Sequence, residues 1–469
     1  MIGGLMKTTS RFAIVAAATL FAGNAYAADL GGNCCTDLEE RVAELEATTV
    51  RKGNRKVSLT VSGQVNEAVI FWDDGFENNA YVVTNNMSRT RFRFVGDAKI
   101  NADWKTGYLL EIGVRYANSG NRTQLTPNAG GESNSIDIRH SAWWLENKQL
   151  GRIWVGETSS ASDGITEINL ANAITAGNDP SAWGGGYFLR KADNTLSALR
   201  WNNITPSFAG SWAMDGDRNN IVRYVSPTFQ GFTVSAAWGE DDMWDVALRY
   251  ANEFNGVRVA AGIGYKQHSD NVGKSGADGI ICADTLSGVT GVSGVDCNTL
   301  GLSGAIMHVP TGLYVHASWS RTEDKNRDVV FGYNVKDEDR HWYIQGGIER
   351  NFFGIGKSTF YGEYGNYETG AALSSTGGVA SNAASAASAI NVAAGGIGGP
   401  AANDRIGSAD ATQWGFGFIQ GVDAAAMDLY IAYKHFEADV VTTTATGTGA
   451  VTVSPKDWDA VVMGAIIRF

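Results

Sequence analysis

The chain has 469 residues, of which 44% are hydrophobic and 18% charged, and its formal net charge is −12 at pH 7. An acidic surface repels phosphate backbones, so the composition argues against nucleic acid as a partner. The counts of 58 Gly, 19 Phe, 16 Tyr, 14 Trp and 7 Pro fit many strands carrying interfacial aromatic side chains better than a helical enzyme.

Residues 1–27 have the features of a secretory signal peptide. A basic start precedes an apolar stretch at 12–22 and an A-x-A cleavage site at 25–27, which places the mature N-terminus at Ala28. The apolar stretch is too short to span a bilayer, and no other run approaches the ~20 residues that a membrane helix needs. The sequence therefore argues against a helical membrane protein. Export also means an oxidising compartment, in which disulfides form.

The mature N-terminal segment, 28–56, contains a short helical pattern. Leu38, Val42, Leu45 and Thr49 are spaced 4, 3 and 4 residues apart, which makes a seam of two heptads. Two heptads are too few for a stable helix alone. We expect either a coiled coil of three copies or a single amphipathic helix folded against the body of the protein.

From residue 57 onward the apolar residues alternate with polar ones, as in strands that have one lipid face and one water face. The terminal segment, 458–469, alternates in the same way and ends on the aromatic Phe469. The sixteen predicted strands are the one that begins at residue 57, then 89–100, 108–116, 136–145, 152–157, 221–225, 232–238, 244–250, 257–266, 300–308, 313–320, 342–349, 359–367, 414–420, 428–435 and 458–469.

A secretory signal and a terminal strand ending in Phe are typical of outer-membrane barrels, so residues 57–469 are predicted to form an all-β, 16-stranded antiparallel transmembrane β-barrel. Short periplasmic links should alternate with long outer loops, and the N-terminal segment should lie in the periplasm. A further strand-like stretch, 196–204, would break this alternation if it were placed in the wall. We therefore assign it to one long third outer loop, 159–219.

Two other outer loops have distinct features. The loop at 368–409 is of low complexity, rich in Ala, Gly and Ser, and is expected on the surface. The fifth outer loop contains Cys282 and Cys297, for which a loop-closing disulfide is the preferred interpretation. Cys34 and Cys35 are adjacent and cannot bridge each other comfortably, but in a trimer they could cross-link neighbouring chains.

The segment from Ala28 to Gly63, with its Asn-Cys-Cys-Thr-Asp-Leu-Glu-Glu-Arg-Val run, resembles the start of alphaproteobacterial porins of the rhizobial and Brucella type. The stretch 224–232, Tyr-Val-Ser-Pro-Thr-Phe-Gln-Gly-Phe, is similar to a strand-turn-strand motif of general porins. The resemblance implies a homotrimeric general diffusion porin in which the third loop folds inward. It also implies recognition of Phe469 by the barrel-assembly machinery, contact with membrane lipid and lipopolysaccharide, and attachment of Ala28 to peptidoglycan.

Charges that face each other across the pore should set its selectivity. Phe92 and Phe94 occupy one face of their strand, so the arginines between them should face the lumen. The predicted basic wall is Arg89, Arg91, Arg93, Arg115, Arg139 and Arg223, and the predicted acidic loop residues opposite are Asp163, Glu167 and Asp179. For each of these residues, bracing of the wall or a solvated loop position remains an alternative. Net charge favours a mild cation preference, and no metal or cofactor is expected.

Three alternatives remain open. An enzyme is unsupported, since the sequence has neither an H-E-x-x-H nor a G-x-S-x-G motif. A substrate-specific sugar or anion channel would line its pore with aromatic side chains, for which Tyr314, Tyr361, Tyr430 and Trp143 are candidates. A structural tether between outer membrane and peptidoglycan would use the N-terminal helix and the outer loops.

Overall fold

The structure, a computed structural model, describes residues 56–114, 116–126, 136–173, 176–177, 182–205, 218–239, 242–269, 296–325, 336–370, 405–443 and 451–469. The predicted leader, the heptad segment, Ala28, Cys34 and Cys35 lie outside these residues, and the statements about them stay predictions.

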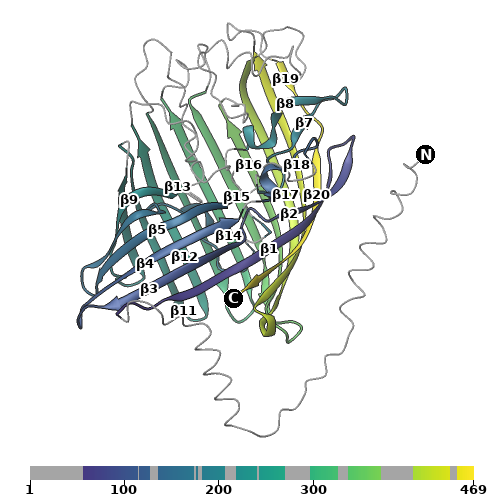
Figure 1. The fold of residues 1–469 in the computed structure, drawn as a ribbon. Helices are drawn as coiled ribbons and strands as arrows, with labels where there is room; N and C mark the ends of the chain where they lie inside the picture. The colour runs from purple at the N-terminus through teal and green to yellow at the C-terminus, as the bar shows by residue number, and fades with distance from the viewer. Residues whose placement is uncertain are drawn as a thin grey trace. The chain divides into compact units, whose positions relative to one another are not determined.

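All but two of the described strands form one antiparallel sheet that closes on itself (Figure 1). The sheet has 18 strands, of which β2(Asn78–Thr84) and β19(Val451–Val453) stand outside the ring and leave sixteen in it. In ring order these are β1(Thr60–Asp73), β3(Arg91–Lys99), β4(Trp104–Val114), β5(Ile136–Asn147), β6(Gly151–Ser159), β9(Arg218–Val225), β10(Phe232–Gly239), β11(Trp244–Phe254), β12(Val257–His268), β13(Cys297–His308), β14(Leu313–Asp324), β15(Glu338–Arg350), β16(Ser358–Thr369), β17(Arg405–Val422), β18(Met427–Thr443) and β20(Trp458–Arg468). Each predicted strand overlaps one strand of this ring, so the prediction of a 16-stranded antiparallel barrel is confirmed.

The alternation in the sequence becomes an inner and an outer face. In β14, Tyr314, His316 and Ser318 are buried inside the barrel, whereas the alternate residues Leu313 and Val315 are more than half exposed on the outside. Large apolar side chains recur on the outer face of most strands. A barrel wall of this kind presents its apolar face to lipid and its polar face to the lumen.

Pairing of the first and last strands closes the ring. β1 pairs with β20 from Gln64 to Asp73, and the Gly63 amide donates to the Phe469 carbonyl at 2.8 Å. The Phe469 amide donates back to the Gly63 carbonyl at 3.0 Å. No backbone group in hydrocarbon can turn to water, so this closure satisfies what would otherwise be two unpaired edges.

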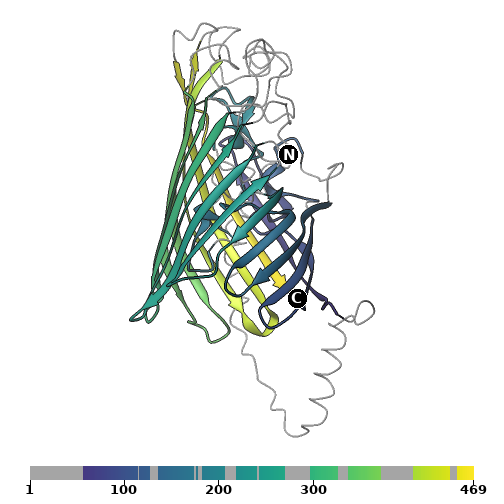
Figure 2. The same ribbon diagram turned by 90° about the vertical axis from the view of Figure 1, so that its left-hand side faces the viewer.

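The two ends of the barrel differ. The links β3–β4, β5–β6, β9–β10, β11–β12, β13–β14, β15–β16 and β17–β18 are short and lie at the end that also carries the chain terminus, here called the short-turn end (Figure 1). The opposite end, here called the long-loop end, carries the longer connections. The wall is uneven in height, because β6 has 9 residues whereas β17 has 18. The green wall accordingly rises further toward the long-loop end than the blue wall (Figure 2).

The first strand, predicted to begin at residue 57, begins at Thr60 and has 14 residues. It runs on to Asp73, and its second half turns back into β2, which pairs with it from Glu67 to Asp73. β1 therefore has β3 as its neighbour only from Thr60 to Gln64. The short alternation in β2 follows Asn78 and Asn79, residues that favour turns, which hid the strand in the sequence.

The helical turns within the described ranges are short 3-10 segments such as η1(Ser119–Asn121), η2(Ile165–Glu167), η4(Trp201–Asn203) and η7(Asp423–Ala425). No helix of the described residues is long and apolar enough to cross a membrane.

The geometry at the closure explains why residue 63 is glycine. A Cβ on Gly63 would lie 2.6 Å from the Arg91 carbonyl oxygen and 2.6 Å from the Phe469 ring. We predict that Gly63→Val displaces the terminal ring and lowers the fraction of protein that assembles as a heat-modifiable barrel on SDS gels, because overpacking costs about 1–3 kcal/mol. Gly362→Ala is the matched control: its Cβ would have no neighbour closer than 3.9 Å, so it should assemble normally. Equal assembly of the two variants would contradict this account.

Candidate functional site

The connection between β6 and β9, residues 160–217, is called loop 3 here. Its described residues, 160–173, 176–177 and 182–205, fold into the barrel. Its beginning is held by two arginines of the wall. Arg223 on β9 donates to the carbonyls of Ser159 (2.8 Å) and Ser160 (3.3 Å). Arg249 on β11 donates to the carbonyl of Asp163 at 2.7 Å. Arg223, predicted as a pore-lining charge, is thus bound to the loop backbone, which is the bracing role left open by the sequence.

Further along, loop 3 is fastened to one strand of the wall after another. Asp245 on β11 accepts from the amide and the hydroxyl of Ser162, each at 2.6 Å. Ser303 on β13 lies next, and its hydroxyl accepts from the amide of Ile168 at 3.2 Å. Asn169 then donates to Gln345 on β15 at 2.8 Å. These contacts carry the loop across the inner face from β11 to β15.

The next contacts of loop 3 are with acidic residues of the wall. The amide of Asn172 donates to Glu349 at 2.7 Å, and its side chain donates to Asp428 on β18 at 2.9 Å. The described start of loop 3 therefore lies along the inner wall from β11 to β18, across the ring from β3 to β5.

A buried polar network of the wall includes Gln345, the residue that binds Asn169 of loop 3. Glu363 on β16 and Lys434 on β18 form an ion pair with fully buried side chains. Glu363 also accepts from the Tyr343 hydroxyl at 2.6 Å and from the Gln413 amide at 3.0 Å. Tyr343 in turn accepts from Gln345, the loop's own partner, at 2.9 Å. Removing one partner of such a buried pair typically costs about 3–5 kcal/mol, so the network fixes the wall to which the loop binds.

Further along loop 3 is a two-stranded hairpin, β7(Phe188–Arg190) and β8(Leu196–Arg200), which pairs with itself and not with the wall. The stretch 196–204 thus lies inside the loop, as the sequence analysis assigned it. Tyr187, just before β7, packs between Trp72 and Trp458, with ring centroids 5.1 Å from each. The main buried apolar cluster of the described residues therefore lies inside the barrel, between loop 3 and the wall.

An ion pair joins the hairpin to Asp74 in the turn between β1 and β2. Arg190 donates from Nε and Nη2 to one carboxylate oxygen of Asp74, at 3.0 and 2.7 Å, and both residues are buried. Gln124 adds a third bond to Asp74 at 3.0 Å. Burial alone would raise the pKa of Asp74, but the hydrogen bonds from Arg190, the Glu77 amide and Gln124 outweigh it and hold this pKa below its ordinary value of 3.8.

Opposite loop 3, three arginines converge on one carboxylate. Arg93 donates from Nε to Glu111 at 2.8 Å, and Arg139 donates from Nε to the other oxygen of Glu111 at 2.7 Å. The guanidinium of Arg91 lies 3.6 Å from Glu111. These four residues, here called the arginine cluster, carry three positive charges around a single negative one.

The register explains this convergence. Arg93 lies opposite Glu111 in the β3–β4 ladder, and Glu111 lies opposite His140 in the β4–β5 ladder. A bulge between Glu111 and Ile112 turns Arg139 inward beside His140. The predicted inward face of Arg91 and Arg93 therefore depends on the alternation, whereas that of Arg139 depends on a bulge that the sequence does not reveal.

Two further arginines border the cluster. Arg89 precedes β3 and pairs with Asp137 at 3.0 Å. Arg218, which the sequence analysis did not select, donates to His140 at 3.4 Å. Glu111 was also missed, although a single carboxylate in the otherwise apolar strand 108–114 was the available signal.

The remaining predicted site residues have varied positions. Asp163 and Glu167 lie half-buried in loop 3, Glu167 at the end of η2. Arg115 and Asp179 lie outside the described residues. Cys297 opens β13 and is disulfide-bonded, but Cys282 is not described, so the pairing of these two cysteines stays a prediction.

The aromatic candidates for a substrate track separate into two groups. Tyr314, Tyr361 and Tyr430 are buried on the inner face. Trp143 is 51% exposed on the outer face, because Ala142 and Trp144 occupy the inward positions of β5. The expectation that Trp143 could face the pore is therefore wrong.

A closed antiparallel barrel with an apolar exterior, a charged lumen and a loop folded inside defines a diffusion channel of the outer membrane. The sequence profile of the Gram-negative porin family matches residues 13–440, and the chain belongs to this family. Family and fold make it an integral outer-membrane channel rather than an enzyme.

Solved structures show the same fold at low sequence identity. The anion-selective porin from Comamonas acidovorans is 14% identical, with a TM-score of 0.53, and the match covers 88% of this chain and 100% of that one. OprB of Pseudomonas putida, in its high-pH structure, is 10% identical with a TM-score of 0.51, and the match covers 92% and 97%. None of the curated proteins matches the sequence.

The lowered pKa of Asp74 makes the hairpin anchor sensitive to acid. A carboxyl with a depressed folded pKa contributes its full stabilisation above the ordinary value of 3.8 and loses it as the pH falls toward the folded value. We predict that hydrogen exchange of the β7–β8 amides rises when the pH is lowered through this range, after correction for intrinsic exchange rates. Asp74→Ala should show the raised exchange already at pH 7, whereas Asp103→Ala, a change at an exposed carboxyl in the turn between β3 and β4, should not. An unchanged hairpin in Asp74→Ala would contradict the anchor.

Proposed function

We propose that this porin is a general diffusion pore for small hydrophilic solutes and ions, constricted between the arginine cluster and loop 3. The observation that carries the proposal is the arrangement of charge: Arg91, Arg93 and Arg139 outnumber Glu111 on one wall, while Asp163 and Glu167 belong to the loop strapped to the other. Opposed charges across a narrow passage produce a transverse field, which orients dipolar solutes and slows bulky apolar ones.

Local charge rather than total charge should determine ion preference. Screening reduces charge effects beyond about 8 Å at physiological ionic strength, so charges on outer loops count little. The side chain of Arg93 is 42% exposed, the largest exposure among the three arginines, which makes it the member that a passing ion meets.

The test of this proposal is the reversal potential of purified protein in a planar bilayer under a KCl gradient. Arg93→Gln should open as wild type does but shift the reversal potential toward cation preference by several millivolts, because one positive charge leaves the passage. Arg340→Gln removes an equally charged, half-exposed side chain on the outside of β15 and should leave the potential unchanged. Identical reversal potentials for Arg93→Gln and wild type would contradict the placement of the arginine cluster at the constriction.

The substrate-specific channel is less well supported. Tyr314, Tyr361 and Tyr430 are almost fully buried and are therefore not available as a stacking track for a passing sugar.

The proposed oligomer is a homotrimer whose interface includes the outer face of β1 and β20. Glu67 lies on this face, opposite Ala465 of β20, and accepts hydrogen bonds from the hydroxyls of Thr84 (3.0 Å) and Thr90 (2.9 Å). An ionisable group on the lipid face of a barrel is costly. Cover by a second copy of the chain would remove Glu67 from lipid.

Adding bulk to this face should separate the subunits. Ala465→Trp is expected to migrate as a folded monomer on native gels, because an indole would prevent close approach of the outer faces, while each barrel still conducts. The control is Ala317→Trp, which adds the same ring on the outer face of β14 and should remain trimeric. A wild-type monomer, or a trimeric Ala465→Trp, would contradict the proposed interface.

The short-turn end is proposed to face the periplasm. The N-terminal segment, with its helix, single or coiled-coil, is likewise proposed to be periplasmic. Phe469 would be the residue read by the barrel-assembly machinery, and Ala28 the attachment point to peptidoglycan. The likeness of the segment from Ala28 to Gly63 to rhizobial and Brucella porins supports placement in the alphaproteobacterial branch.

A further inference from the structure

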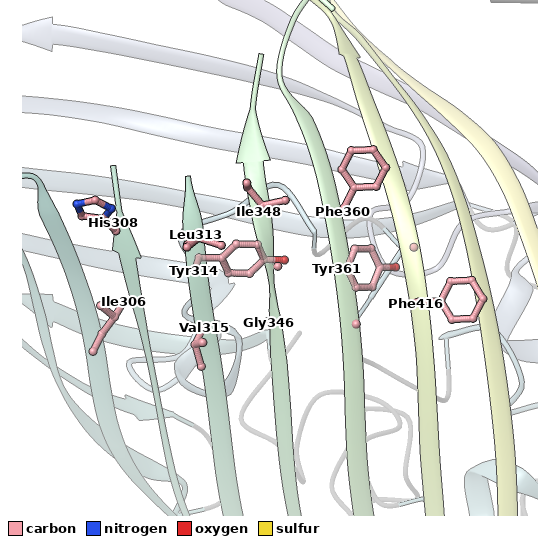
Figure 3. Close-up of a pocket in the computed structure, with 13 residues that line it drawn as sticks. Ile306, His308, Leu313, Tyr314, Val315, Gly346, Ile348, Phe360, Tyr361 and Phe416 are labelled. Carbon is pink, nitrogen blue, oxygen red and sulfur yellow. The ribbon is translucent and has the colours of Figure 1, made fainter. Parts of the chain in front are cut away.

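A groove runs along the lipid-facing wall from β13 to β17, near the short-turn end. Its volume is about 920 Å³, and its lining is almost entirely apolar. Ile306 and Val315 form one bank and Phe416 the other, with Gly346 between them (Figure 3). These residues lie in one row across the sheet, since Val315 pairs with Gly346, which pairs with Gly362.

Two adjacent glycines on the outer face keep the groove open, and neither is demanded by the fold. A Cβ would have no neighbour closer than 3.7 Å at Gly346 or 3.9 Å at Gly362, and neither residue has a positive φ. The inward glycines beside them are different, because a Cβ on Gly347 would lie 2.1 Å from a backbone oxygen and one on Gly417 would lie 2.4 Å from Tyr361. Side chains fit at 346 and 362, and their absence creates the groove.

A cationic group lies where the groove meets the short-turn end. Arg350 is exposed, shares the outer face of β15 with Gly346 and Ile348, and follows Gly346 by four residues, about 13 Å along a strand. It makes no ion pair with another described residue. Phe352 and Phe353 in the turn just beyond it are 48% and 62% exposed, as is typical of side chains at the membrane interface.

We propose that this groove binds one phospholipid of the leaflet at the short-turn end, with its phosphate at Arg350 and one acyl chain along Gly346 and Gly362. The inference rests on the membrane placement of the barrel, and the proposed orientation makes this leaflet the periplasmic one. In lipid the hydrophobic effect does not favour the groove over the bulk bilayer, so retention comes from close packing and from the charge-assisted hydrogen bond of guanidinium to phosphate.

The measurement is native mass spectrometry of the full-length protein in a mild detergent, titrated with palmitoyl-oleoyl phosphatidylglycerol or with the matching diacylglycerol, which lacks the phosphate. The wild type should retain one phosphatidylglycerol per chain about tenfold more strongly than diacylglycerol. Arg350→Gln should abolish that preference. The double variant Gly346→Leu/Gly362→Leu should lose the retained lipid of either kind.

Controls separate the groove from general effects. Ala317→Leu adds the same bulk on the outer face of β14, outside the groove, and should retain lipid as wild type does. Heat-modifiable migration verifies that each variant folds. Equal retention by wild type and the double variant overturns the site, and equal retention by wild type and Arg350→Gln overturns the phosphate contact. A change of oligomeric state in the double variant would instead identify the groove as a subunit interface and overturn the lipid.

The experiments can contradict the proposed lipid site and the proposed pore independently of each other. Loss of lipid in the double variant with unchanged conductance supports the groove and leaves the pore intact. A wild type that retains lipid and conducts no current would overturn the proposed pore and not the groove.

Discussion

The hydrogen-bonded ladder between β1 and β20 is the constraint on which the rest of the structure depends. It removes the last two open edges of the sheet, as every backbone in hydrocarbon requires. Closure also fixes which side chains point inward, because a slip of one residue would exchange the two faces of a strand. The close fit of Gly63 against the Phe469 ring shows how tightly this register is set at the terminus.

Within the closed ring, the two sides of the lumen carry different groups. Loop 3 is fastened from β11 to β18 by side chains that the alternation turns inward, such as Asp245, Gln345 and Glu349. The arginine cluster occupies the opposite wall, where no comparable series of loop 3 contacts is seen among the described residues. In the proposed function this asymmetry matters, because a loop fixed to one wall would narrow the passage and leave the charges of the other wall accessible.

The ring could be predicted from the sequence because period two and turn chemistry are local. Arg91 and Arg93 followed from the same rule, through Phe92 and Phe94 on the other face. Glu111 could not be selected in this way, since its importance comes from the three arginines that the register brings to it. The same holds for Glu363 and Lys434, which the register places on either side of Gly415 in one row of the wall. Arg190 and Asp74 are also far apart in sequence, and they meet because loop 3 folds inward.

We propose that loop 3, held against one wall opposite the arginine cluster, sets the width of the pore. Single-channel current in polyethylene glycols of graded size tests it directly, since polymers that enter the pore lower its conductance. We predict a sharp cut-off at a small polymer, well below the size that the open lumen of a 16-stranded barrel would admit. A folded barrel that carries no current would contradict the proposed pore, and one that admits large polymers would contradict its narrowing by loop 3.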